Sequence, residues 1–112
     1  MTSISSSGRI RDLNDAMRRA GPSCGRWMMT QGVMAEGPEF ILLAMRAVQT
    51  YSAFDSGNDP YGEHDFGAFD LAGHRLFWKI DYYDRELRYG SNDPSDPTLT
   101  THVLTLMLAS EY

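Results

Sequence analysis

The first half of the chain carries apolar residues at helical spacing in two stretches. The first stretch predicts a helix that begins after Ser7, whose side chain suits an N-cap, and ends at the Gly21-Pro22 pair. Its apolar face consists of residues three or four positions apart, namely Ile10, Leu13, Met17 and Ala20. A second helix is predicted from Pro38, which suits the first helical position, and its run FILLAMRAVQTY has so broad an apolar face that the helix must be heavily buried.

Three further segments have the pattern of β-strands. The run RWMMTQ, residues 26–31, is apolar and bounded by glycines, which predicts a short strand. The runs DFGAFDL and HRLFWKIDYY each alternate between two faces, as strands with one buried face do. Ala72-Gly73 separates these two runs and suits a tight two-residue turn, so residues 65–83 are predicted to form a β-hairpin.

The two-residue turn fixes which residues lie opposite each other in this hairpin. Gly67 is predicted to face Trp78 and to leave room for its ring. On the other face, opposite charges are predicted to pair: Asp70 with Arg75, and His64 with Asp81. The predicted core face consists of Gly67, Phe69, Leu71, Leu76, Trp78, Ile80 and Tyr82.

The C-terminal segment carries signals of a third helix. Asp96 and Pro97 suit a cap and a first turn. An apolar stripe follows, formed by Leu99, Val103, Leu106 and Met107, with His102 on the solvated side. The order α-β-α-β-β-α predicts an α+β fold, with three helices packed on a small, mostly antiparallel, three-stranded sheet. The expected organisation is a single domain over residues 8–112 after a flexible N-terminus over residues 1–7.

Composition and charge narrow the class of partner and the cellular compartment. The chain has 112 residues, of which 42% are hydrophobic, and a net charge of -5. Its ten basic residues are spread out, which disfavours general nucleic-acid binding, although Arg9, Arg11, Arg18 and Arg19 could form a local basic face. The single cysteine, Cys24, the polar N-terminus and the absence of a membrane-length apolar run predict a soluble cytoplasmic protein with no membrane contact.

The central motif NDPYGEHDFG, followed by FWKIDYYD, resembles a bacterial family catalogued only as a domain of unknown function. The resemblance also takes in IRDLNDAMR, GPEFILLAMRAV and TTHVLTLMLASEY, and so extends over nearly the whole chain. It implies a small cytoplasmic protein, often carried by proteobacterial plasmids and other mobile elements, with an accessory role. It brings no activity and no catalytic residue.

The motif NDPYGEHDFG also raises a catalytic hypothesis. A carboxylate that orients an imidazole is the usual way to prepare a histidine for acid–base chemistry, and His64 opposite Asp81, with Glu63 beside it, would form such a pair. No nucleophile stands out, and the alternative is a histidine that only ties the loop to a strand. The loop fails the calcium-binding pattern, since its sixth position from Asp55 is Pro60, so we predict no metal and no cofactor.

A binding hypothesis rests on aromatic and charged residues near the end of the hairpin. Tyrosine supplies much of the energy at protein interfaces. The expected function is therefore a small regulatory or inhibitory protein-binding module, for example a modulator of host defence, with a protein partner; a homodimer stays open. The alternative is a small hydrolase or transferase that uses His64 and Asp81. The predicted binding residues are Tyr61, Phe77, Lys79, Tyr83, Asp84 and Tyr89.

Overall fold

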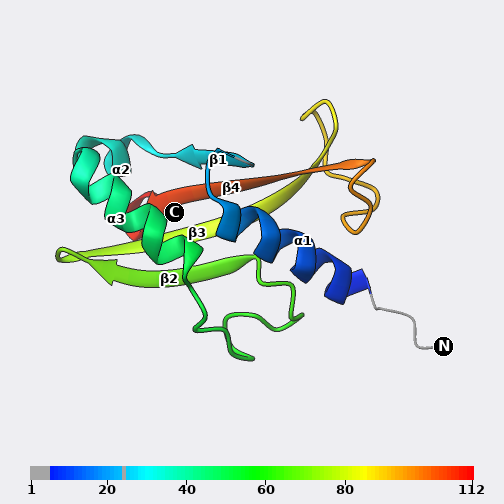
Figure 1. Ribbon diagram of the computed structural model, residues 1–112, viewed down its shortest axis with the longest axis horizontal. Helices are drawn as coiled ribbons and strands as arrows, with labels where there is room; N and C mark the ends of the chain where they lie inside the picture. The colour runs from blue at the N-terminus through cyan, green and yellow to red at the C-terminus, as the bar shows by residue number, and fades with distance from the viewer. Residues whose placement is uncertain (1–5, 24) are drawn as a thin grey trace.

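The computed structural model describes residues 6–23 and 25–112 (Figure 1). Cys24 and most of the predicted flexible N-terminus lie outside these residues, whereas Ser6 and Ser7 already belong to the first helix. The helices are α1 (Ser6–Ala20), α2 (Gln31–Ala35), α3 (Pro38–Gln49) and a terminal 3-10 turn, η1 (Ala109–Glu111). The strands are β1 (Arg26–Met29), β2 (Phe66–Leu71), β3 (His74–Asp84) and β4 (Thr100–Leu108).

The four strands form one mixed sheet in the order β1-β4-β3-β2. β3 is antiparallel to both of its neighbours, and the short β1 is parallel to β4. The α+β class, the first strand and the helix that begins at Pro38 are confirmed, and the helix predicted after Ser7 begins at Ser6. The sheet has four strands and a parallel edge, where three mostly antiparallel strands were expected.

The hairpin has the predicted register. The paired residues run from Leu71 with His74 to Phe66 with Lys79. Ala72 and Gly73 both have positive φ, at +50° and +81°, as the tight turns that match strand twist require. A Cβ on Gly67 would lie 2.3 Å from Trp78 Nε1, so this position has room only for glycine.

The predicted C-terminal helix is wrong, because residues 100–108 form β4, an interior strand of the sheet. Asp96 does begin a turn, but its carboxylate accepts hydrogen bonds from the backbone N–H and hydroxyl of Thr98 and caps no helix. Both faces of β4 are covered, since Val103, Leu104 and Met107 are all buried. A strand buried on both faces carries a nearly continuous apolar run, which periodicity alone does not distinguish from a helix.

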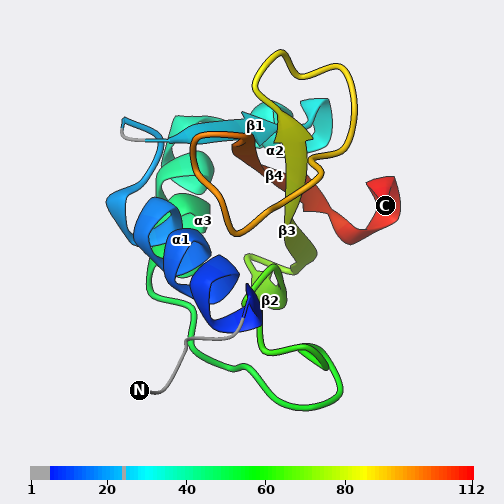
Figure 2. The same cartoon turned by 90° about the vertical axis from the view of Figure 1, so that its right-hand side faces the viewer.

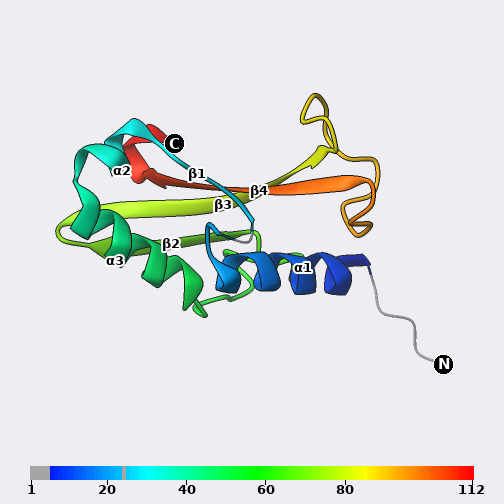
Figure 3. The same ribbon diagram turned by 45° about the horizontal axis from the view of Figure 1, so that its top comes forward.

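Helices α1 and α3 lie on the opposite face of the sheet from the C-terminal turn. α1 and α3 run along one face, and the chain end with η1 lies across from them (Figures 2 and 3). The core lies between α3 and the sheet, and its fully buried members include Val48, Leu76 and Trp78. In the described ranges 6–23 and 25–112, no helix is long and apolar enough to span a membrane.

Candidate functional site

His64 lies in the loop before β2, and its ring is held on three sides. The ring stacks on Phe54 with 3.8 Å between centroids and 3° between planes. Its Nδ1 lies 2.9 Å from Asp15 Oδ1, and its Nε2 lies 3.5 Å from Asp59 Oδ2. Both nitrogens therefore face carboxylates from α1 and from the loop itself.

The predicted pairing of His64 with Asp81 is wrong. The ladder continues one residue beyond β2, where the Asp65 carbonyl accepts a hydrogen bond from the Ile80 N–H. At His64 the backbone then takes a positive φ of +55°, so the chain leaves the strand path and the ring is held by Asp15 of α1. Asp81 instead pairs with Lys79, 2.9 Å away on its own strand, and this hydrogen bond raises the pKa of Lys79.

Acidic groups of the loop lie close together around this histidine. Burial raises the pKa of Asp65, and the neighbouring Glu63 carboxylate raises it further. For Asp15, burial acts to raise the pKa, but hydrogen bonds from His64 and Arg18 outweigh it, so the net shift is downward. Asp15 is therefore held as a carboxylate between His64 and Arg18.

A fully buried amide, Asn14 of α1, connects this loop to β3 and β4. Its Nδ2 donates to the Glu63 carbonyl and to the Tyr82 hydroxyl, each at 3.0 Å. The Tyr82 hydroxyl donates in turn to Glu63 Oε1 at 2.9 Å, and burial raises the pKa of this phenol. Glu63 thus has a structural role through both its backbone and its side chain.

His102 belongs to the same network, which corrects its predicted solvated position. Its Nδ1 lies 2.7 Å from Asn14 Oδ1, and its Nε2 lies 3.1 Å from the Pro94 carbonyl. Its ring also meets the Tyr82 ring edge-on, with centroids 4.9 Å apart. Burial lowers the pKa of His102, and the Pro94 carbonyl opposes this shift.

Arg18 is buried rather than part of an exposed basic face. Its side chain is 1% exposed, and it donates to the carbonyls of Val48 and Tyr51 at the end of α3. It also pairs with Asp15 at 3.0 Å and lies over the Trp78 ring, 5.4 Å from the centroid. The guanidinium therefore joins α1 to the C-terminal end of α3, where free carbonyls attract a cation.

The predicted binding residues fall into separate groups. Phe77, Lys79 and Tyr83 alternate along β3 on the face opposite α1 and α3, and Phe77 contacts Phe66 and Tyr112 at centroid distances of 5.3 and 5.5 Å. Tyr61 and Tyr89 are exposed on two different loops. The Asp84 carboxylate accepts a hydrogen bond from the Arg88 N–H and so shapes the turn after β3.

Sequence reasoning missed Asn14 and Tyr112 as functional or network residues, and it gave Arg18 a possible place on a basic face where the structure buries it. Asn14 and Arg18 follow Ile10 at spacings of four and eight residues, on the same side of the helix as an apolar residue. A polar residue that continues an apolar helix face was the available signal of a buried polar group. In the described part of the chain, no three His, Cys, Asp or Glu side chains come together as metal ligands would.

Comparison with known proteins identifies a family but no described relative. No curated protein and no solved structure matches the chain significantly. A family model described as "Protein of unknown function (DUF3768)" matches residues 29–111, which include α2, α3 and all of β2, β3 and β4. The resemblance expected from the central motif is confirmed, and the chain belongs to this family of unknown function.

Proposed function

We propose that the protein is a small regulatory or inhibitory binding module that docks on a protein partner. Its docking surface is the open face, defined as the side of the sheet opposite α1 and α3 that carries Phe66, Phe77, Lys79, Asp81 and Tyr112. The observation that supports this proposal most strongly is an aromatic cluster. It lies on the sheet face away from α1 and α3, where the chain end with η1 also lies. Figure 2 shows these two helices on the opposite side of the sheet from the C-terminus.

The cluster has the composition of an interface anchor. Phe66 and Phe77 contact each other across β2 and β3, and both meet Tyr112 edge-on. Tyr112 is 76% exposed, so the cluster reaches the surface. Aromatic residues are enriched at the centres of protein interfaces because they bury a large area with few rotatable bonds.

A charged pair beside the cluster offers a partner polar groups to which it can form hydrogen bonds or ion pairs. Lys79 and Asp81 are 38% and 37% exposed and face solvent on the same side of β3 as Phe77. An exposed ion pair contributes only about 0–1 kcal/mol to folding, so a partner can reorganise it at small cost. The net charge of -5 favours a partner with a basic surface.

The geometry gives no comparable support to the enzyme hypothesis. That hypothesis depended on a histidine oriented by Asp81, whereas both nitrogens of His64 are engaged by Asp15 and Asp59. In this conformation both nitrogens face carboxylates of the protein itself. The regulatory role, the cytoplasmic location and the bacterial mobile-element setting rest on the sequence and the resemblance, and they form part of the proposal.

The proposal is tested by affinity capture with matched surface variants. The chain is used as bait in lysate of its native host, as wild type, as Phe77→Ala and as Leu42→Ala. Leu42 is 49% exposed on α3, so its substitution removes an exposed apolar side chain from the helix side. A protein that is retained by the wild type and by Leu42→Ala but lost with Phe77→Ala supports the proposal.

Two results contradict it. One is a partner retained equally by Phe77→Ala and the wild type, which would place docking elsewhere. The other is the absence of any partner together with a turnover that depends on His64. Analytical ultracentrifugation of the same three proteins distinguishes self-association, since a homodimer through the open face would also be lost with Phe77→Ala.

A further inference from the structure

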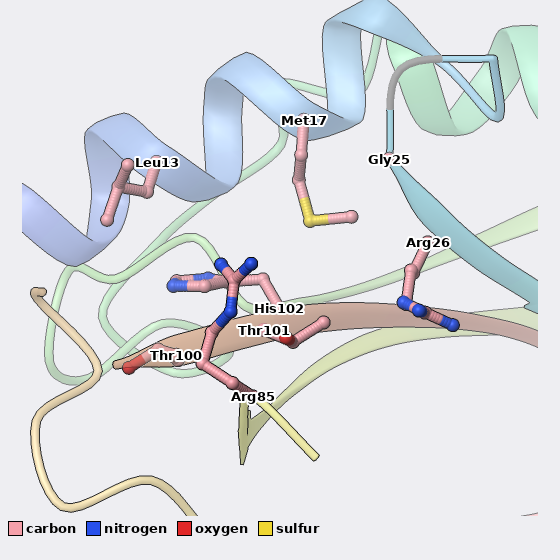
Figure 4. A pocket seen from close by; sticks show the side chains of 8 residues that line it. All are labelled: Leu13, Met17, Gly25, Arg26, Arg85, Thr100, Thr101 and His102. Carbon is pink, nitrogen blue, oxygen red and sulfur yellow. The ribbon is translucent and has the colours of Figure 1, made fainter. Parts of the chain in front are cut away.

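A cavity opens where α1 passes over the beginnings of β1 and β4. Its volume is about 370 Å³, within the range of sites that hold small molecules. Leu13 and Met17 extend into it from α1, and Arg85 extends toward α1 from the end of β3 (Figure 4). The remaining lining comes from the beginnings of the two strands: Gly25, Arg26, Thr100, Thr101 and His102.

The charged side chains that line this cavity are basic, whereas the chain as a whole is acidic. Two arginines line it and no acidic residue does, although acidic residues outnumber basic ones by fifteen to ten in the sequence. Among the described residues, neither Arg26 nor Arg85 forms an ion pair. Arg85 donates one hydrogen bond, from Nη1 to the Pro97 carbonyl at 3.2 Å, and its other donors remain for a ligand.

His102 on the cavity wall lies between two oxygens. Pro94 offers a carbonyl oxygen, which can only accept. The Asn14 amide is oriented by the Glu63 carbonyl, which requires Nδ2 on that side, so Asn14 presents its own acceptor oxygen to His102. Only a doubly protonated ring donates to both oxygens, whereas burial disfavours that form in the free protein. A bound anion would favour it.

The rest of the lining favours a ligand with an apolar part. Leu13 and Met17 form one wall of mixed hydrocarbon and thioether character. The Thr100 hydroxyl already donates to the Asp93 carbonyl. A purely inorganic ion would leave this apolar wall uncovered.

We propose that the cavity between α1, β1 and β4 binds a small organic anion: a compact phosphate or carboxylate group held by Arg85 and Arg26, joined to an apolar body packed against Leu13 and Met17. Arginine suits this role because its planar guanidinium matches both anionic groups in two-point contacts. None of the residues that line the cavity is among those that define the open face, so the two proposals are tested independently.

Isothermal titration calorimetry on the full chain tests the proposal with three probes. Phenyl phosphate and phenylacetate separate the phosphate and carboxylate forms of the ligand, and inorganic phosphate measures the anionic group alone. We expect saturable binding of at least one aryl anion, at least about tenfold tighter than inorganic phosphate, because the apolar wall is then covered. Arg85→Gln should weaken that binding by about tenfold or more through loss of a charge-assisted contact, and Arg26→Gln should act in the same direction.

Arg88→Gln is the matched control. Arg88 is exposed in the same loop as Arg85 but does not line the cavity, so its loss removes the same net charge at a different place. It should leave the affinity within about twofold, a difference that corresponds to well under 1 kcal/mol. Equal weakening by Arg88→Gln and Arg85→Gln would show non-specific charge attraction and overturn the proposal, as would the absence of saturable binding by either aryl anion.

Histidine NMR gives a second readout at the cavity itself. The bound anion should raise the pKa of His102, followed through its ring carbon-bound proton. The signal of His74, at the other end of β3 from Arg85, should stay unchanged. Because His74 pairs with Glu36 and neither residue lines the cavity, the His74 signal reports any general effect of the added salt. An aryl anion that saturates without moving the His102 titration binds elsewhere, and the proposal is then wrong.

Discussion

The contact between Gly67 and Trp78 gives the sharpest test of the hairpin and its core face. A Cβ added to Gly67 would lie 2.3, 2.6 and 2.8 Å from Nε1, Cε2 and Cζ2 of Trp78. The indole is fully buried and cannot withdraw, because Tyr51, Phe54 and Arg18 pack around it. Gly67→Ala must therefore displace the strand or the ring.

The expected cost follows from two opposing effects. Overpacking a core costs about 1–3 kcal/mol. Because the Trp78 ring has no space to move away from the added Cβ, the cost for this variant should lie near the upper end of that range. Restricting the unfolded chain by adding a Cβ recovers about 0.4–1 kcal/mol. The net loss in the free energy of unfolding is about 2 kcal/mol, which lowers Tm by roughly 8 °C for a domain of this size.

Urea unfolding followed by far-UV circular dichroism measures this loss, with two comparisons. Gly90→Ala is the control, since its Cβ would meet only the Tyr82 carbonyl oxygen at 3.9 Å, and its stability should change by less than about 0.5 kcal/mol. Trp78→Phe removes the indole nitrogen, so Gly67→Ala should cost at least about 1 kcal/mol less in that background. Full additivity of the two substitutions, or a Gly67→Ala protein as stable as the wild type, would refute the packing described here.

Three further predictions concern the polar contacts. Asn14→Ala leaves the Glu63 carbonyl and His102 without their buried partner and should lower the free energy of unfolding by about 2–3 kcal/mol in urea titrations, whereas the exposed Asn92→Ala should change it little. The folded-state pKa of Asp15 is lowered, so its stabilising contribution is present above the unfolded value of 3.8 and is lost as pH falls through the lower folded pKa. On acidification below about pH 4, Asp15→Asn should therefore lose less stability than the wild type. Equal acid sensitivity of the two proteins would contradict this sign. Glu111 accepts hydrogen bonds from Thr30 Oγ1 and from the N–H groups of Gly32 and Leu108. Glu111→Ala should therefore speed hydrogen exchange at the Gly32 and Leu108 amides, while distant amides of α3 keep their exchange rates.

Local chemistry made part of this fold predictable. The hairpin register follows from a two-residue turn and an alternating pattern, and both are encoded within about twenty neighbouring residues. The start of the helix at Pro38 was predictable because proline is favoured at the first position of a helix. The course of residues 100–108 was not predictable in this way, because β4 gains its strand partners from β1 and β3, far away in the sequence.

In the candidate site, too, the residues of a short local motif were predictable, whereas their partners from distant parts of the sequence were not. Glu63 and His64 were singled out from a short polar motif, and both do join polar networks. Their partners Asn14 and Asp15 come from α1, about fifty residues earlier, and the positive φ of His64 turns its ring away from the strand. A register argument extended past the end of a strand therefore assigned the wrong carboxylate.

The central proposal is that a protein partner docks on the open face and not on the side of the sheet that carries α1 and α3. Site-specific photo-crosslinking in the native host tests it most directly, with a photoreactive phenylalanine analogue placed at position 77 or, in a second protein, at position 42. Both positions retain solvent access, but they lie on opposite sides of the sheet. We predict a discrete crosslinked protein adduct from position 77 and none from position 42; an adduct from position 42 alone would contradict the claim.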